Sequence, residues 1–414
     1  MATDTLFMQS EVVRPKLQQW QEQFAVASNL VKKGEVHRVG ERDFRVPIKL
    51  AAGGRPGTYN PDGGDVGRGT AMKGNVLIST FFPTRINFEL TDLKIDATDS
   101  TEVAVKSAFK EAIKDAMKEM ALADDIYFHT DGTAVAATVT AQATVSSKTV
   151  YTLDSSFGIQ RLRRGWYVKV YATAYGSIRA TDYIYSIDYA NKQITMSTTI
   201  SGAAATDIIC FDGVSGTGSA PAWKSGLYYS NNYASSGTLY GLDRSTEPEL
   251  LANSVNVNGQ VTPNHGLLLL DQIGQRRGEV SDELVGLANT PQRAQIYSQQ
   301  MSLSTWMRGA KDGPIDVLPN VKKTEFPFAG INHMLDYRQD RTRIDWIVPS
   351  LWLRARLFDV KYYEKGGIRF FPIAGTDGAP AASTWFSLLQ AENWVNTDPG
   401  SGGVLYACSQ PSGY

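Results

Sequence analysis

The fold of this chain is decided at residues 99–128, which read DSTEVAVKSAFKEAIKDAMKEMALADDIYF. Asp99 and Glu102 stand three apart at the start of this run, the spacing of a helix capping box. The apolar residues recur at steps of three and four, which predicts one stripe on an amphipathic helix: Val105, Phe109, Ala112, Ile113, Ala116, Met117, Met120 and Ala121. At ~1.5 Å per residue this helix is roughly 40 Å long. Such a helix with a single apolar stripe must lie against something flat.

The composition excludes several classes of protein. The chain has 414 residues, enough for two or three domains, and its 41 Lys and Arg nearly balance 42 Asp and Glu. This balance argues against a dedicated nucleic-acid binder and against a disordered chain. Cys210 and Cys408 form no CxxC pair and are predicted to be small buried hydrophobes. No apolar run approaches ~18 residues and no signal layout begins the chain, so we expect a soluble product of a reducing compartment, without membrane contact.

The first third of the chain predicts two projections. Residues 1–34 form a polar tail and an amphipathic helical arm, which docks either on its own domain or on a neighbouring subunit. Residues 35–90 form one long antiparallel ribbon with a glycine-rich tip between its strands. A two-stranded ribbon is marginal in water, so we expect a neighbouring copy of the chain to cover it. The expected contact residues in this part are Trp20, Phe24, Phe44, Val46, Ile48, Lys49, Arg55, Arg68 and Lys73.

The composition changes after the long helix. Residues 133–218 are rich in Thr, Ala, Val and Tyr, with several short alternating strands and a hairpin turn at 188–193. Flexible segments bracket this stretch on both sides, which indicates a small all-β domain inserted into a host domain.

The host domain is predicted to resume after about residue 220 as mixed α/β structure. A helix begins near Thr262, a buried strand covers 284–288, and Thr290 opens a second helix that runs to about Trp306. Strands follow at 331–335, 344–348 and 353–363. The last strands, at 385–391 and 404–408, are expected to return to the sheet beneath the long helix.

In this order the elements resemble the major capsid protein of tailed bacteriophages, the HK97-like fold. The resemblance covers the chain except residues 133–215, which match an extra insertion domain that some members carry, and the runs at 241–244 and 287–291 add local similarity. It implies an α+β fold with these parts: an N-terminal arm (1–34), an extended β-hairpin loop (35–90), a spine helix with the peripheral-domain sheet (91–132), an all-β insertion domain (133–218), a peripheral-domain return (219–260), an axial domain (261–375) and closing peripheral-domain strands (376–414).

The resemblance also implies a function and partners. The chain is expected to self-assemble into hexamers and pentamers of an icosahedral shell that encloses phage double-stranded DNA, in a virion assembled in the host cytoplasm. The implied partners are other copies of the chain, a portal and a cement or decoration protein, with only weak non-specific DNA contact. Residues 1–10 are too short for an attached scaffolding segment, so a separate scaffolding protein is expected. Lys49 and Lys73 lie away from the ribbon tip, so the covalent crosslink of the family's namesake is not expected.

The sequence carries no recognisable catalytic chemistry. The four histidines share no ligand spacing, and no GxSxG, HExxH, P-loop or GxGxxG motif is present, so we expect no enzyme, cofactor or metal site. The basic cluster of Arg338, Arg341 and Arg343 is interleaved with aspartates, which blunts phosphate contact and favours inter-subunit ion pairs.

Two alternatives accompany this interpretation. An encapsulin-type nanocompartment has the same fold, although the large insertion argues against it. A secreted β-rich carbohydrate-binding protein or hydrolase would explain the Tyr and Trp content of residues 133–229. That class needs an export signal and paired carboxylates across a cleft, and the sequence offers neither.

Overall fold

The computed structural model describes residues 30–31, 37–39, 42–51, 53–54, 69–91, 108–234, 236–307, 325–369, 371–374 and 380–411. These residues divide into two compact units, each described below by itself. Unit 1 contains Phe81–Phe128 and Arg356–Glu392, and unit 2 contains Val31–Thr80, His129–Ala355 and Asn393–Tyr414. Within the described parts of the chain, no helix combines the length and apolar character needed to cross a membrane.

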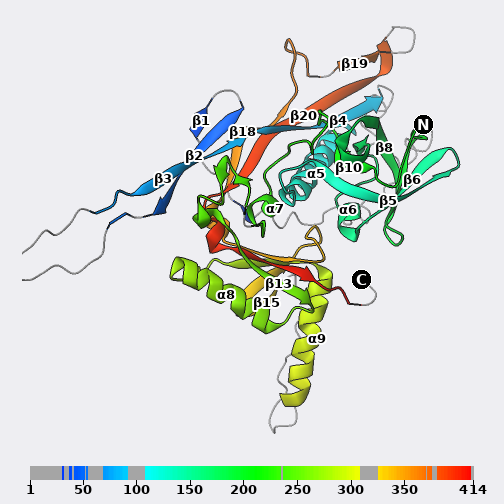
Figure 1. Cartoon of the computed structure of the whole chain (residues 1–414). Helices are drawn as coiled ribbons and strands as arrows, with labels where there is room; N and C mark the ends of the chain where they lie inside the picture. The colour runs from blue at the N-terminus through cyan, green and yellow to red at the C-terminus, as the bar shows by residue number, and fades with distance from the viewer. Residues whose placement is uncertain are drawn as a thin grey trace, which may run out of the picture. The chain divides into compact units, whose positions relative to one another are not determined.

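Unit 1 is a long helix on a sheet. Helix α5 (Ala108–Phe128) lies against a four-stranded sheet of β4 (Phe82–Thr91), β18 (Trp352–Tyr362), β19 (Phe371–Ala374) and β20 (Pro380–Asn396) (Figure 1). Ala116 and Met120 of α5 pack against Leu388 of β20, with Ile86 and Phe88 of β4 beside them. The helix predicted at 99–128 is therefore present over its described part, and its capping box lies outside the described residues.

The apolar stripe of α5 differs from the prediction. Met117 is 53% exposed and Ala121 is also exposed, although both were assigned to the buried face. Residues 122–126 are all buried, Asp124 and Asp125 among them, and Asp124 accepts a hydrogen bond from Gln390 Nε2 at 2.8 Å. This part of the prediction was wrong. In the middle of α5 only a narrow row of residues is buried, whereas in its last turns nearly every residue is buried.

The ribbon is shorter and has one more strand than predicted. Strands β1 (His37–Val39), β2 (Asp43–Ala51) and β3 (Lys73–Thr80) form a three-stranded sheet, with Asp43 opposite Thr80 at the end of the β2–β3 ladder. Beyond Thr80 no residue of β2 is left to pair, so the chain passes through buried Phe81 into β4, which pairs with β20 instead. Residues 82–90 therefore belong to the sheet of unit 1 and not to the ribbon.

Residues 135–211 form a closed six-stranded barrel. Its strands are β5 (Val135–Val145), β6 (Lys148–Leu153), β7 (Tyr167–Tyr171), β8 (Ile178–Asp188), β9 (Gln193–Met196) and β10 (Ile208–Phe211), in the order β10-β5-β6-β9-β8-β7, with helix α6 (Ser156–Gln160) between β6 and β7. The predicted hairpin turn is confirmed between β8 and β9, where Asp188 Oδ1 accepts from the backbone N–H groups of Ala190 and Asn191. The short strands predicted for this stretch are present, with the short helix α6 among them.

A six-stranded mixed sheet and two helices complete unit 2. The sheet contains β13 (Asn253–Gly259), β14 (Val285–Ala288), β15 (Glu325–Phe328), β16 (Ile331–Leu335), β17 (Ile344–Ile347) and β21 (Gly403–Cys408), in the order β13-β21-β17-β14-β16-β15. Helices α8 (Pro263–Arg277) and α9 (Thr290–Met307) accompany it, and α8 begins after the N-cap Thr262, as predicted. Short elements join these parts: α7 (Leu227–Ser230), β11 (Thr238–Leu239), β12 (Leu242–Asp243) and 3-10 turns at Thr173–Tyr175, Pro248–Leu250, Pro349–Leu351 and Pro399–Ser401.

Several strands lie in a different sheet from the one predicted. Residues 403–408 were expected beneath the long helix, but β21 pairs with β13 and β17 in unit 2. Val404 and Leu405 are adjacent on the strand and both fully buried, so both faces of β21 are covered, and the turn Pro399–Ser401 separates it from β20. Conversely, most of β18 and all of β19, assigned by sequence to the axial part, lie in the sheet of unit 1.

Candidate assembly interface and its buried support

The apolar side chains of β2 become more exposed from Phe44 toward Ile48. Phe44 has 0% and Val46 6% of its surface exposed, so both lie within the subunit's own core. Ile48 is half-buried and Lys49 is exposed. The prediction that Phe44 and Val46 contact a neighbour is therefore wrong, because they anchor the root of the ribbon where β1 adds a third strand. Trp20, Phe24, Arg55 and Arg68 lie outside the described residues.

A groove runs beside the root of the ribbon. Its volume is about 430 Å³, and one wall is β2 from Val46 to Leu50. The ion pair of Arg277 with Asp398 and the carboxylate of Glu249 also line the hollow. The outer part of β2 therefore presents a partly polar concave surface at the base of an exposed strand.

Lys73 is paired within the chain. Its Nζ donates to Glu247 Oε2 at 2.6 Å, although the Lys73 side chain remains 51% exposed. This hydrogen bond raises the pKa of Lys73 above its ordinary value. The pair ties the start of β3 to the loop after β12. The contact of Lys73 with a neighbouring subunit remains a prediction.

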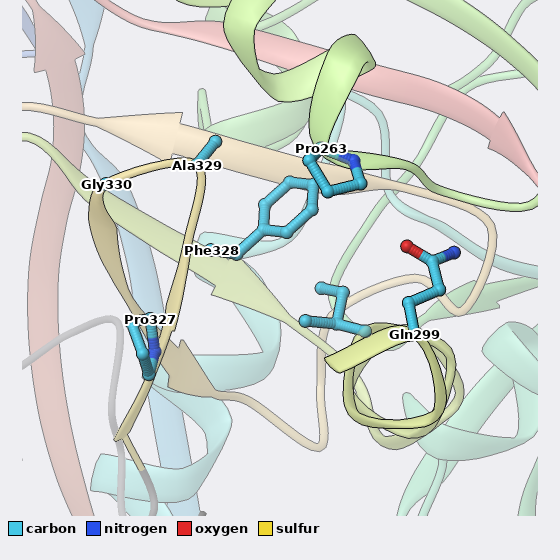
Figure 2. Close-up of a pocket in the computed structure, with 7 residues that line it drawn as sticks. Pro263, Gln299, Pro327, Phe328, Ala329 and Gly330 are labelled. Atoms are coloured by element: carbon cyan, nitrogen blue, oxygen red, sulfur yellow. The ribbon is translucent and has the colours of Figure 1, made fainter. Parts of the chain in front are cut away.

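A second hollow, of about 190 Å³, lies between the first turn of α8, helix α9 and the β15–β16 turn (Figure 2). Pro263 and Phe328 line it on one side and Gln299 of α9 on the other. The Gln299 Nε2 group donates to Val261 O, so the amide supports the loop before α8. The lining is mostly apolar and carries no cluster of titratable groups.

Unit 2 contains a buried ion pair. Arg343 and Asp345 form a bidentate ion pair, with Nη2–Oδ1 at 2.6 Å and Nε–Oδ2 at 2.7 Å, and Asp345 has 0% of its side chain exposed. Arg343 also donates to Asn231 O at 3.1 Å, and its guanidinium lies 4.1 Å from the centre of the Tyr228 ring. Burial lowers the pKa of Arg343, but Asp345, Tyr228 and Asp340 together raise it by more, so the guanidinium stays charged.

Arg343 was predicted to form an ion pair with a neighbouring subunit. This prediction is wrong, because the Arg343 side chain is buried and paired with Asp345 of its own chain. Arg338 Nη1 donates to Gln160 O at 2.9 Å, and the Gln160 side-chain oxygen accepts from Arg341 Nε at 2.8 Å. These contacts join the loop after β16 to helix α6 of the barrel. The inter-subunit role of Arg338 and Arg341 remains a prediction.

A second buried pair stands directly after the end of α5. His129 Nε2 lies 2.9 Å from Asp336 Oδ2, with 0% and 2% of the two side chains exposed. Burial raises the pKa of Asp336, but the neighbouring His129 and the Arg338 N–H lower it by more, so its pKa is below the ordinary value. The His129 carbonyl accepts from Arg161, which also donates to Val135 O at 2.8 Å. Sequence analysis treated His129 as an isolated residue because Asp336 is distant in the sequence.

Asn393 is a structural residue that sequence analysis missed. Its side chain is fully buried, and Oδ1 accepts from Ser225 N at 2.7 Å while Nδ2 donates to Ser79 Oγ at 3.0 Å and Thr80 O at 2.8 Å. The amide thus ties the end of β3 to the segment before α7. No local sequence signal indicates it, because Ser79 and Ser225 lie far from Asn393 in the chain.

Replacing Asn393 with alanine is expected to lower the free energy of unfolding by about 2–3 kcal/mol, because it leaves the buried Ser225 N–H and Thr80 carbonyl without their partner. Urea denaturation of the purified protein measures this change. The matched control is Asn191→Ala, which removes one hydrogen bond to Asp188 in an exposed turn and should cost less than about 1 kcal/mol. Equal effects of the two variants would contradict the assigned role.

His333 is buried, and within the described part of the chain its ring contacts are the aromatic side chains of Phe326, Phe328 and Trp346 and the Ile331 carbonyl. Trp346 Nε1 donates to His333 Nε2 at 2.8 Å, and His333 Nδ1 lies 3.1 Å from Ile331 O, so the neutral imidazole is the form that fits. Burial lowers the pKa of His333 to about 4. A Cβ at Gly286 would stand 2.1 Å from the His333 ring, so only glycine leaves room for the ring at this place.

The stability of the protein is therefore expected to fall as the pH decreases from about 6.5 to 4. In this window the unfolded chain binds a proton on His333 and the folded chain does not. A pKa of about 4 for His333, against its ordinary value of 6.5, corresponds to about 3 kcal/mol of stability, present above pH 6.5 and lost by about pH 4. Denaturation measured across this range should show the slope, and His333→Phe should flatten it. An unchanged slope in that variant would assign it to other groups.

Comparison with known proteins concerns the fold. No protein-family model matches this chain. No curated protein sequence matches it either. Among solved structures, a chain of the cyanophage A-1(L) capsid asymmetric unit is 13% identical with a TM-score of 0.51, over 94% of this chain and 95% of that chain. A chain of the capsid of an empty GTA particle is 8% identical with a TM-score of 0.50, over 94% and 91%. The holo-SrpI encapsulin of Synechococcus elongatus PCC 7942 is 10% identical with a TM-score of 0.45, over 95% of this chain and 91% of that chain.

These similarities identify the class of fold to which the protein belongs. The chain has the HK97-like fold of phage capsid proteins, so the resemblance drawn from the order of its elements is confirmed at the level of the fold. Among the described residues, no group of three or more His, Cys, Asp and Glu side chains is arranged to hold a metal ion.

Proposed function

We propose that this chain is a structural subunit of a phage capsid, which performs no reaction and assembles with its own copies into hexamers and pentamers of an icosahedral shell around double-stranded DNA. The observation that supports this function most directly is the fold shared over 94% of the chain with a chain of the cyanophage A-1(L) capsid. In this proposal the protein is a virion component assembled in the host cytoplasm. A portal, a separate scaffolding protein and a decoration protein are further proposed partners, and DNA is contacted only weakly.

The parts of the chain take the following roles in this proposal. Residues 1–34 are the arm, β2 and β3 carry the extended loop, α5 is the spine helix on the peripheral sheet, and 133–218 are an insertion domain. The axial domain is the six-stranded sheet with α8 and α9, to which β13 and β21 contribute from outside residues 261–375. The barrel supports the insertion proposal because its first and last strands, β5 and β10, pair with each other, so the chain enters and leaves at one place.

Assembly through an exposed ribbon is multivalent. A subunit that offers its ribbon to one neighbour and receives the ribbon of another makes several modest contacts at once, and the effective concentration of the later contacts is high. Interfaces of this head-to-tail kind close into rings. The exposed outer half of β2, with Ile48 and Lys49, supplies such a contact surface, while Phe44 and Val46 hold its root in the subunit.

Electron microscopy and sedimentation of the purified full-length protein test the proposal. We expect rings or closed shells that form above a threshold protein concentration. Particles isolated from infected cells should contain nuclease-protected double-stranded DNA. Shells filled with a folded protein cargo instead would favour the encapsulin-type alternative. A monomer that stays dispersed at every concentration and in the presence of scaffolding protein would contradict a shell function.

A further inference from the structure

The outer face of the barrel carries a row of exposed tyrosines. Tyr167 is 57% exposed, Tyr183 38% and Tyr185 44%. Tyr167 of β7 stands directly opposite Tyr183 of β8, with ring centres 5.7 Å apart. Tyr183 and Tyr185 are two apart on one strand and so share its outer face, and the intervening Ile184 is fully buried in the barrel. Scattered exposed aromatic residues are ordinary, but a contiguous row of them usually marks a binding surface.

Two cations stand beside this row. The Lys148 ammonium lies over the Tyr185 ring, 2.9 Å from its centre, and the Arg164 guanidinium lies 6.0 Å from the same centre. Residues 133–218 contain seven Lys and Arg, five Asp and no Glu, a formal charge of +2, so the rest of the chain carries −3 of the total of −1. Residues 133–218 are therefore slightly basic and the rest of the chain slightly acidic, and the two cations beside the tyrosine row favour an anion there.

Hydroxyl groups surround the row. Thr181, two residues before Tyr183 on β8, is exposed. Thr195 of β9, half-buried, is paired with Ser186 beside Tyr185. The face thus combines aromatic rings, neutral hydroxyls that donate and accept hydrogen bonds, and two positive charges.

We propose that this face of the barrel binds an acidic polysaccharide. The apolar faces of its sugar rings stack on Tyr167, Tyr183 and Tyr185, and its carboxylates pair with Lys148 and Arg164. The threonine hydroxyls bind the sugar hydroxyls. This inference concerns the barrel alone and does not depend on the shell function proposed above.

Charge density favours a polysaccharide over a nucleic acid. Duplex DNA carries one charge per ~1.7 Å, and its binders typically neutralise about 6–10 phosphates. The two cations found within cation–π distance of the row are Lys148 and Arg164. An acidic polysaccharide carries about one charge for each one or two sugar rings and exposes many hydroxyls, which matches two cations among threonines and tyrosines.

Binding of polygalacturonate oligomers to the full-length protein, measured by calorimetry at low salt, tests the proposal. We expect saturable binding that weakens as salt is raised, and no comparable binding of neutral dextran. The double substitution Tyr183→Ala with Tyr185→Ala should weaken binding at least tenfold, Tyr185→Phe should retain it, and Lys148→Gln with Arg164→Gln should remove most of its salt dependence. The matched control is Tyr337→Ala, which removes a tyrosine that is 50% exposed outside the barrel.

Each outcome decides the proposal. Loss of polygalacturonate binding in the tyrosine double variant, with binding retained in Tyr337→Ala and an unchanged unfolding midpoint, supports it. Absence of polygalacturonate binding, equal binding of dextran, tighter binding of a single-stranded oligonucleotide, or equal loss in Tyr337→Ala each overturns it. If the tyrosine double variant does not fold, the variant Lys148→Gln with Arg164→Gln tests the proposal instead. Loss of most of the salt dependence of polygalacturonate binding supports the proposal, and an unchanged salt dependence overturns it.

Discussion

Replacing Asp345 with alanine is expected to lower the free energy of unfolding by about 3–5 kcal/mol, or to yield no folded protein. The change leaves the Arg343 guanidinium buried without its bidentate partner. It also removes the acceptor for Gln339 Nε2 and for Asn231 Nδ2. A buried charge without a counter-charge is costly because water no longer solvates it. Urea denaturation of the purified subunit, followed by tryptophan fluorescence, measures the loss.

The control is an exposed pair on the other unit. Arg369 Nε and Glu364 Oε2 are 3.0 Å apart, but their side chains are 56% and 45% exposed. Glu364→Ala should change stability by less than about 1 kcal/mol, because water and salt screen such a pair. The double variant Arg343→Met with Asp345→Leu removes both charges and should recover much of the loss. A small effect of Asp345→Ala would show that the pair is hydrated.

The elements with strong local signals were predicted well. Helix α8 starts after Thr262 with Pro263 at its first position, and strand β14 and helix α9 have a buried run and a Thr–Pro start. The pairing of strands within the sheets was predicted less well. Strands β4 and β21 were each recognised as strands but assigned to the wrong sheet, because alternation shows which face of a strand is buried and not which strand lies beside it.

The same distinction explains the candidate contact residues. Alternation of Phe44, Val46 and Ile48 identified one apolar face of β2, but sequence does not show whether a neighbour or the subunit itself covers that face. The aspartates interleaved with Arg338, Arg341 and Arg343 were interpreted as partners in inter-subunit ion pairs. One local signal was available: Arg343 and Asp345 are two apart at the start of a strand whose residues are all buried, so both side chains point to one face. Tyr228 and Asn231, which complete that cluster, are too distant in sequence to be inferred.

Deleting residues 55–68 is expected to abolish shell formation while leaving the subunit folded. The two ends of the deletion are close, because Gly54 N donates to Thr70 O at 2.9 Å and Thr70 Oγ1 donates to Gly54 O at 2.7 Å. Joining Gly54 to Gly69 places Gly54 and Gly69 between Gly53 and Thr70 as a new two-residue turn, which replaces the Gly54–Thr70 hydrogen bonds, and glycine adopts the positive φ angles that such a turn requires. The root of the ribbon, held by Phe44 and Val46, is untouched, so the unfolding free energy should change by less than about 1 kcal/mol.

The deletion should change the protein concentration required for assembly far more than it changes the free energy of unfolding. If the ribbon contributes about 3 kcal/mol to the contact with a neighbour, its loss raises the protein concentration required for assembly by at least about 100-fold. Light scattering across a concentration series measures this threshold. A matched pair of charge reversals refines the test, because Lys49 is exposed on the ribbon and Lys192 is exposed in a barrel turn. Lys49→Glu should raise the threshold and Lys192→Glu should not. Shells that form from the deletion variant at the ordinary concentration would mean that the ribbon does not hold neighbouring subunits together, and the proposed route of assembly would be wrong.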